Sequence, residues 1–141
     1  MANVIPYAFR GELFTGTHNF ASGGDSFKLA LYTSNPYNTS STVYVATNEV
    51  SSSGTNYTAT GNALTGNAVV YATAVASCDF ADTTWSSATI TATHAALYND
   101  DQGDKLCVVL DFGGSFTCTN GTFTVSFPNP STASNAIISM A

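Results

Sequence analysis

The segment KLCVVLDFGGSFTCTNGTFTVSF, residues 105 to 127, decides the fold. Its first part, residues 106 to 110, is a short apolar run rich in β-branched residues, typical of a strand buried on both faces, although a buried helix segment shows the same periodicity. Its last part alternates: Phe123, Val125 and Phe127 share one side and hydroxyl side chains share the other. This alternation predicts a half-buried strand, whose apolar face the rest of the chain must cover.

Turn signals bound the alternating part. Asn120 and Gly121 precede it and favour a tight turn with positive φ. Pro128 and Pro130 follow it and predict its end, because proline has no N–H for the ladder. We therefore expect two strands here with a turn between them.

Further strands are predicted on both sides of this segment. Residues 99 to 104, Asn-Asp-Asp-Gln-Gly-Asp, predict a turn leading into it. Residues 44 to 50 fit either a short strand or an irregular connection. The remaining predicted strands are residues 27 to 32, 68 to 80, 89 to 98 and 136 to 140.

One short helix is predicted, within residues 5 to 16. Phe9 and Leu13 are four residues apart, Pro6 suits a first helical turn, and Gly16 can end the helix. We expect residues 1 to 20 to form an arm or short helix packed on the end of a sheet.

About seven short strands without helical alternation indicate an all-β fold. We expect an antiparallel β-sandwich or barrel, of immunoglobulin-like or jelly-roll-like type, with at most one short N-terminal helix. The 141 residues contain no repeat and no linker, so residues 1 to 141 are expected to form a single β-rich domain.

The composition excludes several classes of function. Only 9% of the residues are charged and the net charge is −6, with three scattered cations, so direct binding of nucleic acid is not expected. No run approaches the ~20 apolar residues of a membrane span. No secretory signal is visible at the N-terminus, so we expect folding in a cytosol.

The three cysteines, Cys78, Cys107 and Cys118, form no metal-binding pattern with His18 or His94. Free thiols are the first interpretation. A Cys107–Cys118 disulfide is the alternative, which needs strands in register and an oxidising environment.

Candidate catalytic groups are few. The only glutamates are Glu12 and Glu49, and nothing places a serine or cysteine beside His18 or His94. His94 is interpreted as a packed or hydrogen-bonded side chain. The carboxylates of residues 99 to 104 fit a β-turn better than a calcium loop. We expect no enzyme activity, no metal and no cofactor.

Several short segments resemble a widespread group of small virion proteins of tailed bacteriophages, over roughly residues 5 to 140. The cysteines and the low charge depart from that group. The segments are FKLALYT (27–33), TNEVS (47–51), GTNYT (54–58), FADTTW (80–85), ATITA (88–92), AALY (95–98), LDFGG (110–114) and NGTFTV (120–125).

The resemblance implies a non-enzymatic capsid decoration (cement) protein. Such a protein is made in the host bacterial cytoplasm and lies on the virion surface. Its partner is the major capsid protein, which it binds as a homo-oligomer, a trimer or dimer. The alternative is a tail or fibre module that recognises a host surface glycan through Tyr-, Asn- and Thr-rich loops. A third interpretation is a secreted β-sandwich binding module, which the missing signal peptide argues against.

Aromatic residues are the candidates for interface contacts, because interfaces are enriched in them. We expect exposed tyrosines in the polar loops to be anchors, or else to cover those loops. In the N-terminal segment, a subunit or capsid contact and packing on the chain's own core are both open. The candidates are Tyr7, Phe9, Phe14, Tyr37, Tyr44 and Tyr57.

Overall fold

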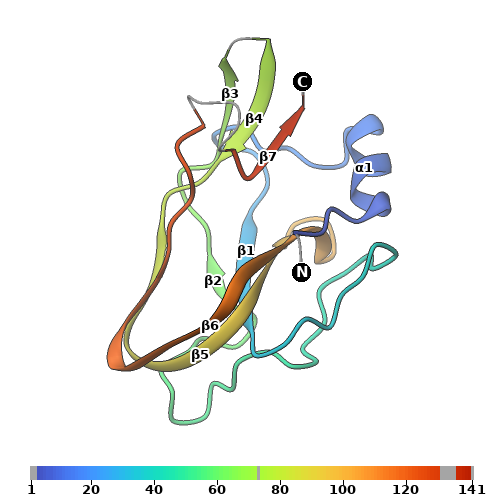
Figure 1. Cartoon of the computed structure of the whole chain (residues 1–141). Helices are drawn as coiled ribbons and strands as arrows, with labels where there is room; N and C mark the ends of the chain where they lie inside the picture. The colour runs from blue at the N-terminus through green and yellow to red at the C-terminus, as the bar shows by residue number, and fades with distance from the viewer. Residues whose placement is uncertain (1–2, 73, 131–135, 141) are drawn as a thin grey trace.

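A computed structural model describes residues 3–72, 74–130 and 136–140, and its strands form two packed antiparallel sheets (Figure 1). The strand orders are β2-β1-β5-β6 and β3-β4-β7. The all-β prediction is therefore confirmed, and the two sheets form a sandwich. The elements are α1 (Tyr7–Phe14), β1 (Phe27–Tyr32), β2 (Asn62–Ala63), β3 (Ala68–Ala72), β4 (Val75–Asp79), β5 (Thr83–Asn99), β6 (Lys105–Val125) and β7 (Ile138–Met140).

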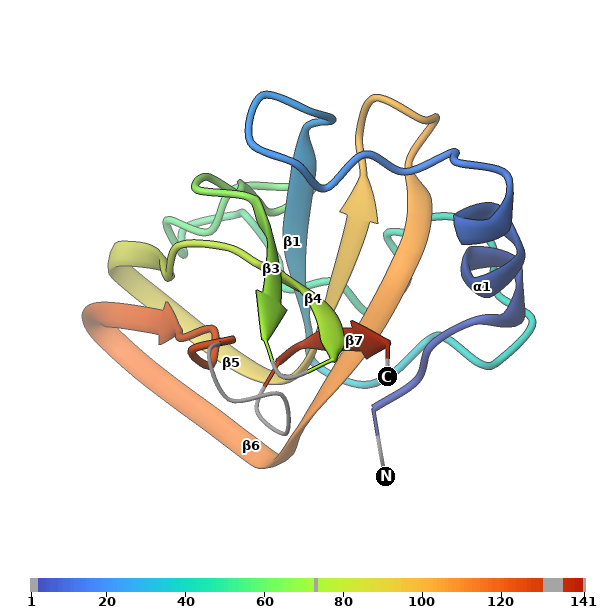
Figure 2. The same ribbon diagram turned by 90° about the horizontal axis from the view of Figure 1, so that it is seen from above.

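Strands β5 and β6 form one long hairpin that bends at a corner (Figure 2). We expected a turn at Asn120-Gly121 between two strands, and this is wrong, because β6 continues through it. Asn120 does have a positive φ of 46°, but it lies in a bulge, where two residues of β6 oppose Thr89 alone. A residue with a positive φ can lie in a bulge as well as in a turn. Here it lies in a bulge, because β6 pairs with β5 on both sides of Asn120.

The corner is a larger irregularity of the same kind. Ala92 pairs with Phe116 and His94 with Asp111, so Thr93 alone opposes residues 112 to 115. The extra residues bend the strand, and Gly113 has a φ of 75° within them. The corner divides β6 into a first arm, residues 105 to 111, and a second arm, residues 116 to 125.

Residues 68 to 80 are not one strand, as we expected, but the hairpin β3–β4. Ala74 lies at its tip with a φ of 66°. The turn contains no glycine or asparagine, the residues that usually indicate one, and alanine seldom adopts a positive φ. The sequence therefore does not predict this turn. Residues 44 to 50 form an irregular connection, tied to the sheet by an isolated bridge between Glu49 and Tyr32.

The predicted helix is present as two turns, α1, with Gly16 in the left-handed conformation just beyond its end. Phe9 is fully buried and Leu13 packs against the core, so these two residues hold the helix on the sheets. Among the described residues, no helix is long and apolar enough to cross a membrane.

Both faces of the four-stranded sheet bury side chains. On one face, Phe27, Leu29 and Leu31 of β1 join the main core with Phe9 and residues of the second sheet. On the other face, Ala30 and Tyr32 belong to a smaller core, covered by Tyr37, Tyr44 and Val45 of the connection between β1 and β2. The burial of β1 on both faces explains why only Lys28 within it is charged.

Candidate functional site

Tyr37 and Tyr57 are buried, so the prediction that these two tyrosines are exposed is wrong. Tyr44 is half-buried and packs on Tyr98, with ring centroids 4.8 Å apart. The polar composition of the connection between β1 and β2 predicts exposure. Instead, Tyr37 and Tyr44 cover one apolar face of the four-stranded sheet, and Tyr57 packs in the main core.

Glu49 joins two of these tyrosines. The hydroxyls of Tyr44 and Tyr57 donate to its carboxylate oxygens at 2.5 and 2.7 Å, and the Leu31 N–H donates to the Tyr57 oxygen at 2.9 Å. Burial is the largest cause that raises the pKa of Tyr44 and Tyr57, and the nearby Glu49 carboxylate also raises it. Their hydroxyls therefore remain protonated donors. The cluster ties the long connection to β1 and serves the fold.

The three N-terminal candidates divide into two groups. Phe9 lies in the core, 5.0 Å from the His18 ring and 6.1 Å from the Phe20 ring, so it packs within the chain. Tyr7 and Phe14 are exposed, and Phe14 is 93% accessible at the end of α1. Of the six aromatic candidates, these two lie where a partner can reach them.

A polar network that the sequence did not indicate fastens α1 to the β5–β6 hairpin. The Glu12 carboxylate accepts from Lys105 at 2.6 Å and bonds to His18 Nε2 at 2.8 Å. On the far side of the ring, Asn99 Nδ2 donates to His18 Nδ1 at 2.9 Å and to Asp25 at 2.8 Å. An amide nitrogen only donates, so His18 accepts at Nδ1 and donates to Glu12 from Nε2.

The other polar candidates also have partners in the fold. His94 Nδ1 lies 2.7 Å from the Thr93 hydroxyl. Asp100 pairs with Lys28 at 2.9 Å, and Asp101 accepts from the Ser26 N–H at 2.7 Å. No group of three metal-binding side chains occurs among the residues the structure covers.

All three cysteines are free. The alternative of a Cys107–Cys118 disulfide is wrong, because both residues lie on the single strand β6, eleven positions apart. The disulfide needs two neighbouring strands in register, but these residues do not face each other across a strand pair, since Cys118 lies opposite Ile90 of β5.

We expect one thiol to react quickly with a disulfide reagent in the native protein and three after unfolding in urea. Cys118 is half-buried, whereas burial raises the pKa of Cys78 to about 12 and that of Cys107 well above its ordinary value. A thiol attacks as its thiolate, so the two buried cysteines react slowly. A Cys118→Ser variant should lose the fast phase, and three fast thiols in the folded protein would contradict the assignment.

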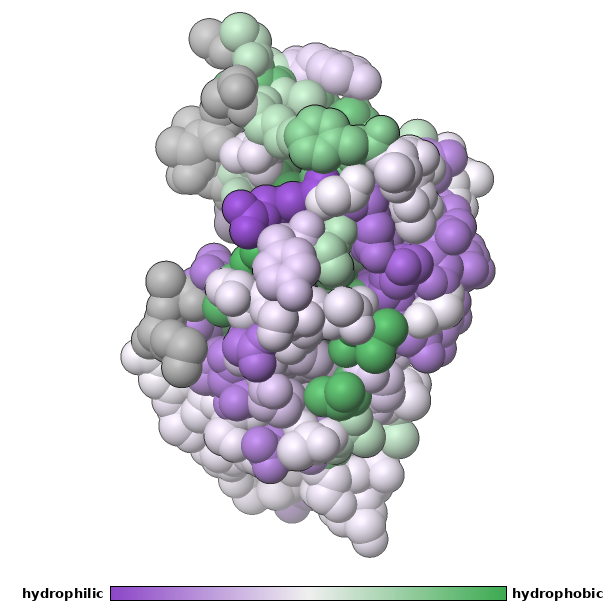
Figure 3. Space-filling view, turned by 90° about the vertical axis from the view of Figure 1, so that its right-hand side faces the viewer, coloured by the Kyte–Doolittle hydropathy of each residue, from purple (hydrophilic) through white to green (hydrophobic). Residues whose placement is uncertain are grey.

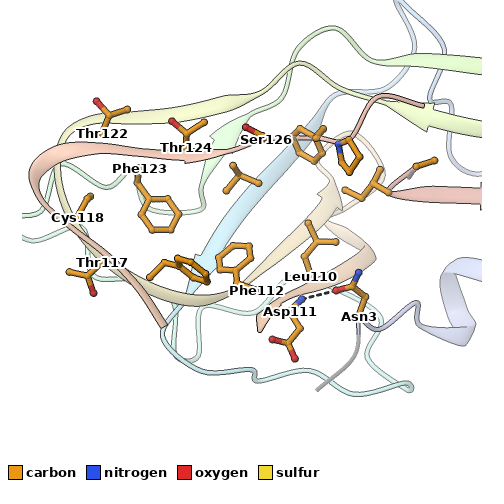
Figure 4. A pocket seen from close by; sticks show the side chains of 16 residues that line it. Asn3, Leu110, Asp111, Phe112, Thr117, Cys118, Thr122, Phe123, Thr124 and Ser126 are labelled. Atoms are coloured by element: carbon orange, nitrogen blue, oxygen red, sulfur yellow. Dashed lines mark hydrogen bonds between the residues drawn. The ribbon is translucent and has the colours of Figure 1, made fainter. Parts of the chain in front are cut away.

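A hollow of about 760 Å³ lies between the two arms of β6 (Figure 4). Phe112 and Phe123 point toward one another across it, with ring centroids 6.4 Å apart. Thr122 and Thr124 point away from it along the rim. Phe116, 54% exposed, also lines it. The hollow therefore combines apolar side chains with polar ones, which are the hydroxyls of the rim and, at one end, Asn3 and Asp111.

The backbone beside this hollow is available for pairing. Within the described ranges, the second arm of β6 pairs with β5 and with no other strand. Its outer edge therefore presents N–H and C=O groups to solvent. An extended peptide can bind such an edge by main-chain hydrogen bonds while its side chains enter a neighbouring pocket. This hollow and edge form the candidate binding site.

No family model, no curated protein and no solved structure matches the chain.

Proposed function

We propose that the protein is a non-enzymatic virion component that decorates a bacteriophage capsid by binding an extended segment of the major capsid protein. The observation that carries this proposal is the hollow between the arms of β6, which lies beside an unpaired strand edge. The resemblance of the short sequence segments to small tailed-phage proteins supplies the kind of partner.

The chemistry of the hollow suits a peptide of low charge. Its interior includes Leu110, Phe112 and Ile137, which pack against the main core, and Asp111 is its only carboxylate. Burying an unpaired charge is costly, whereas an apolar side chain gains free energy on entering such a pocket. We therefore assign the hollow to an apolar segment of the partner, held in register by the edge of β6.

Cryo-electron microscopy of the purified phage particle tests this function. Density of this fold at regular points over the capsid lattice is the expected result, with the β6 hollow facing the shell. Density on the tail alone would favour the host-recognition alternative. Absence of the protein from the particle would overturn the proposal.

Replacing Phe116 by serine is expected to weaken binding to undecorated capsids by about 30-fold, the loss typical of a central interface residue. Phe116 is half-exposed, so its truncation leaves the core intact. Co-sedimentation with capsids over a range of protein concentrations measures the change.

The matched control is Val43→Ser, which removes an apolar side chain of similar exposure, 42%, away from the hollow. We expect this variant to bind as the wild type does. Equal affinity of the Phe116→Ser variant and the wild type would remove the hollow from the interface.

The glycan-binding alternative was based on tyrosine platforms in the polar loops. Tyr37 and Tyr57 are buried, so neither can stack on a sugar. No other observation favours that alternative, and the capsid assignment is therefore preferred.

A further inference from the structure

Asn120 and Gly121 are the only asparagine–glycine pair in the sequence. An asparagine in this position can modify itself, because the amide nitrogen of the next residue can attack the side-chain carbonyl carbon and close a five-membered ring. A side chain on that next residue hinders the approach, and glycine has none. This pair, through which β6 continues as a strand, therefore carries a chemical reactivity of its own.

The backbone around the pair departs from a regular ladder. Asn120 has a φ of 46°, and its N–H donates to the Thr89 side-chain hydroxyl at 3.1 Å. The Thr89 N–H donates outside the strand pair, to the Thr55 carbonyl at 2.9 Å. The register of β5 shifts on both sides of Ala88. Segments with an interrupted ladder open locally at a low cost in free energy.

The Asn120 side chain has the freedom that the reaction needs. It is exposed, and among the residues that the structure describes no hydrogen bond holds its amide. Gly121 is not required by the fold: its φ is not positive, and a Cβ there would make an ordinary contact, 3.6 Å from the Thr119 carbonyl oxygen. The variant Gly121→Ala is therefore expected to fold.

No other asparagine combines these features. Asn56 is the nearest match, because it is exposed and has a φ of 56°. Its Nδ2, however, donates to the Ser87 carbonyl at 2.8 Å, and the large side chain of Tyr57 follows it. Asn99 is fully buried. Sequence and structure together therefore single out Asn120.

The reaction balances with water as its only co-reactant. The Gly121 nitrogen bonds to Cγ of Asn120, the bond from Cγ to Nδ2 breaks, and ammonia leaves with the proton of the Gly121 amide. Water then adds to either carbonyl carbon of the cyclic imide and breaks its bond to the ring nitrogen. The product is an aspartyl or an isoaspartyl residue at position 120. Nothing is oxidised or reduced, and at neutral pH the product carries one new negative charge.

The new charge lies in a part of the chain that otherwise has none. No residue from 112 to 141 is Asp, Glu, Lys, Arg or His. Strongly hydrophilic side chains gather on the side of the molecule that carries α1 (Figure 3). Asn120 belongs to the second arm of β6, between Cys118 and Thr122, which both line the hollow. The modification therefore changes the charge of the candidate binding site.

We propose that Asn120 and Gly121 form a self-modifying site, which converts the neutral second arm of β6 into a negatively charged one as the protein ages. The modification does not depend on the capsid proposal, but its consequence rests on it. A partner segment of low charge binds the altered arm more weakly, because a carboxylate is then buried without a partner. The isoaspartyl form also lengthens the main chain by one atom, which displaces the N–H and C=O groups of the edge.

Incubation of the folded protein in mildly alkaline buffer tests the modification. We expect anion-exchange chromatography to separate a species with one additional negative charge. Peptide mapping by mass spectrometry should place the change at Asn120 and find Asn56 intact. The rate should rise with pH, because the attacking nitrogen must lose its proton. It should be within about ten-fold of the rate in urea, which corresponds to a local opening of no more than about 1.4 kcal/mol.

Two variants separate this reaction from other changes. Gly121→Ala places a methyl group beside the attacking nitrogen, and we expect the reaction to slow about ten-fold, the effect of roughly 1.4 kcal/mol on the barrier. Asn120→Gly tolerates the positive φ but lacks the reacting amide, so the acidic species should not form. Circular dichroism checks that each variant is folded.

Co-sedimentation with undecorated capsids measures the consequence. We expect the separated acidic fraction to bind about ten-fold more weakly than the unmodified fraction, and Asn120→Asp to reproduce the part of this loss that is due to charge. Equal binding of the two fractions would overturn the effect on binding. If neither fraction binds, the capsid proposal fails while the mapped modification stands.

Three results would overturn the modification site itself. One is a folded protein that forms no acidic species in the time that converts the chain in urea. The second is an acidic species that maps to another asparagine. The third is a rate that Gly121→Ala leaves unchanged.

Discussion

Replacing Gly61 by alanine is expected to lower the midpoint of thermal unfolding by roughly 10 °C, which corresponds to about 3 kcal/mol. Gly61 is buried beside β1, and its φ is 85°. A methyl group there would clash with the Leu29 carbonyl and lie 2.7 Å from Cα of Ala30. The positive φ costs about 1–2 kcal/mol for a residue with a Cβ, and the forced shift of β1 adds to it.

The matched control is Gly54→Ala. Gly54 has a similar φ of 70°, but a Cβ there would meet nothing within 4 Å. This variant isolates the backbone term, and we expect a loss of about 1 kcal/mol. Differential scanning calorimetry of both variants measures the two effects. Equal losses would show that the backbone of β1 does not restrict Gly61.

Replacing Glu12 by glutamine is expected to destabilise the protein by about 2 kcal/mol at pH 7. The neutral amide loses the charge that strengthens its hydrogen bonds with Lys105 and His18, and hydrogen bonds to a charged group contribute about 1.5–3 kcal/mol each. We place the loss near the low end of this range because the Lys105 side chain is 36% exposed, and solvent weakens its ion pair with Glu12.

The same carboxylate makes stability depend on pH. Burial raises the pKa of Glu12, but hydrogen bonds from Lys105 and His18 outweigh it, so the pKa lies below the ordinary 4.5. Folding therefore favours the ionised form, and the unfolded chain binds more protons as the pH falls. This contribution is complete above about pH 4.5 and is lost as the pH falls through the pKa of the folded state.

Urea denaturation of the wild type and the Glu12→Gln variant, from pH 7 down to pH 3, measures both effects. The difference in the free energy of unfolding should shrink as the pH falls, because the wild-type carboxyl becomes neutral. Asp100→Asn is the control: the Asp100 carboxylate, which pairs with Lys28, is more exposed than that of Glu12, and we expect a loss of no more than about 0.5 kcal/mol. A difference between Glu12→Gln and the wild type that stays constant with pH would exclude the ion-paired carboxylate as its source.

Short-range patterns predicted several elements correctly. The alternation of Phe27, Leu29 and Leu31 matched β1, and the spacing of Phe9 and Leu13 matched the buried side of α1. These patterns are reliable because side-chain direction repeats every two residues in a strand and every 3.6 in a helix. They depend only on neighbours along the chain.

The candidate surfaces followed from the sequence only in part. Phe14 and Tyr7 were among the predicted contact residues and are exposed, but Phe116 was not predicted. Whether an aromatic residue is buried or exposed depends on whether its loop packs against an apolar face of a sheet. Tyr37 and Tyr57 became core residues for that reason, despite their polar neighbours.

The sequence alone determined an all-β chain with one short helix and few charges, because periodicity and composition can be read without knowing which residues meet in space. Tertiary structure alone decided that β6 continues through Asn120, because β5 supplies an unbroken partner. It also decided that Glu12 meets Lys105, which lies 93 positions away. Such pairings depend on how the sheets close over the shared core, and no pattern within a few residues encodes that.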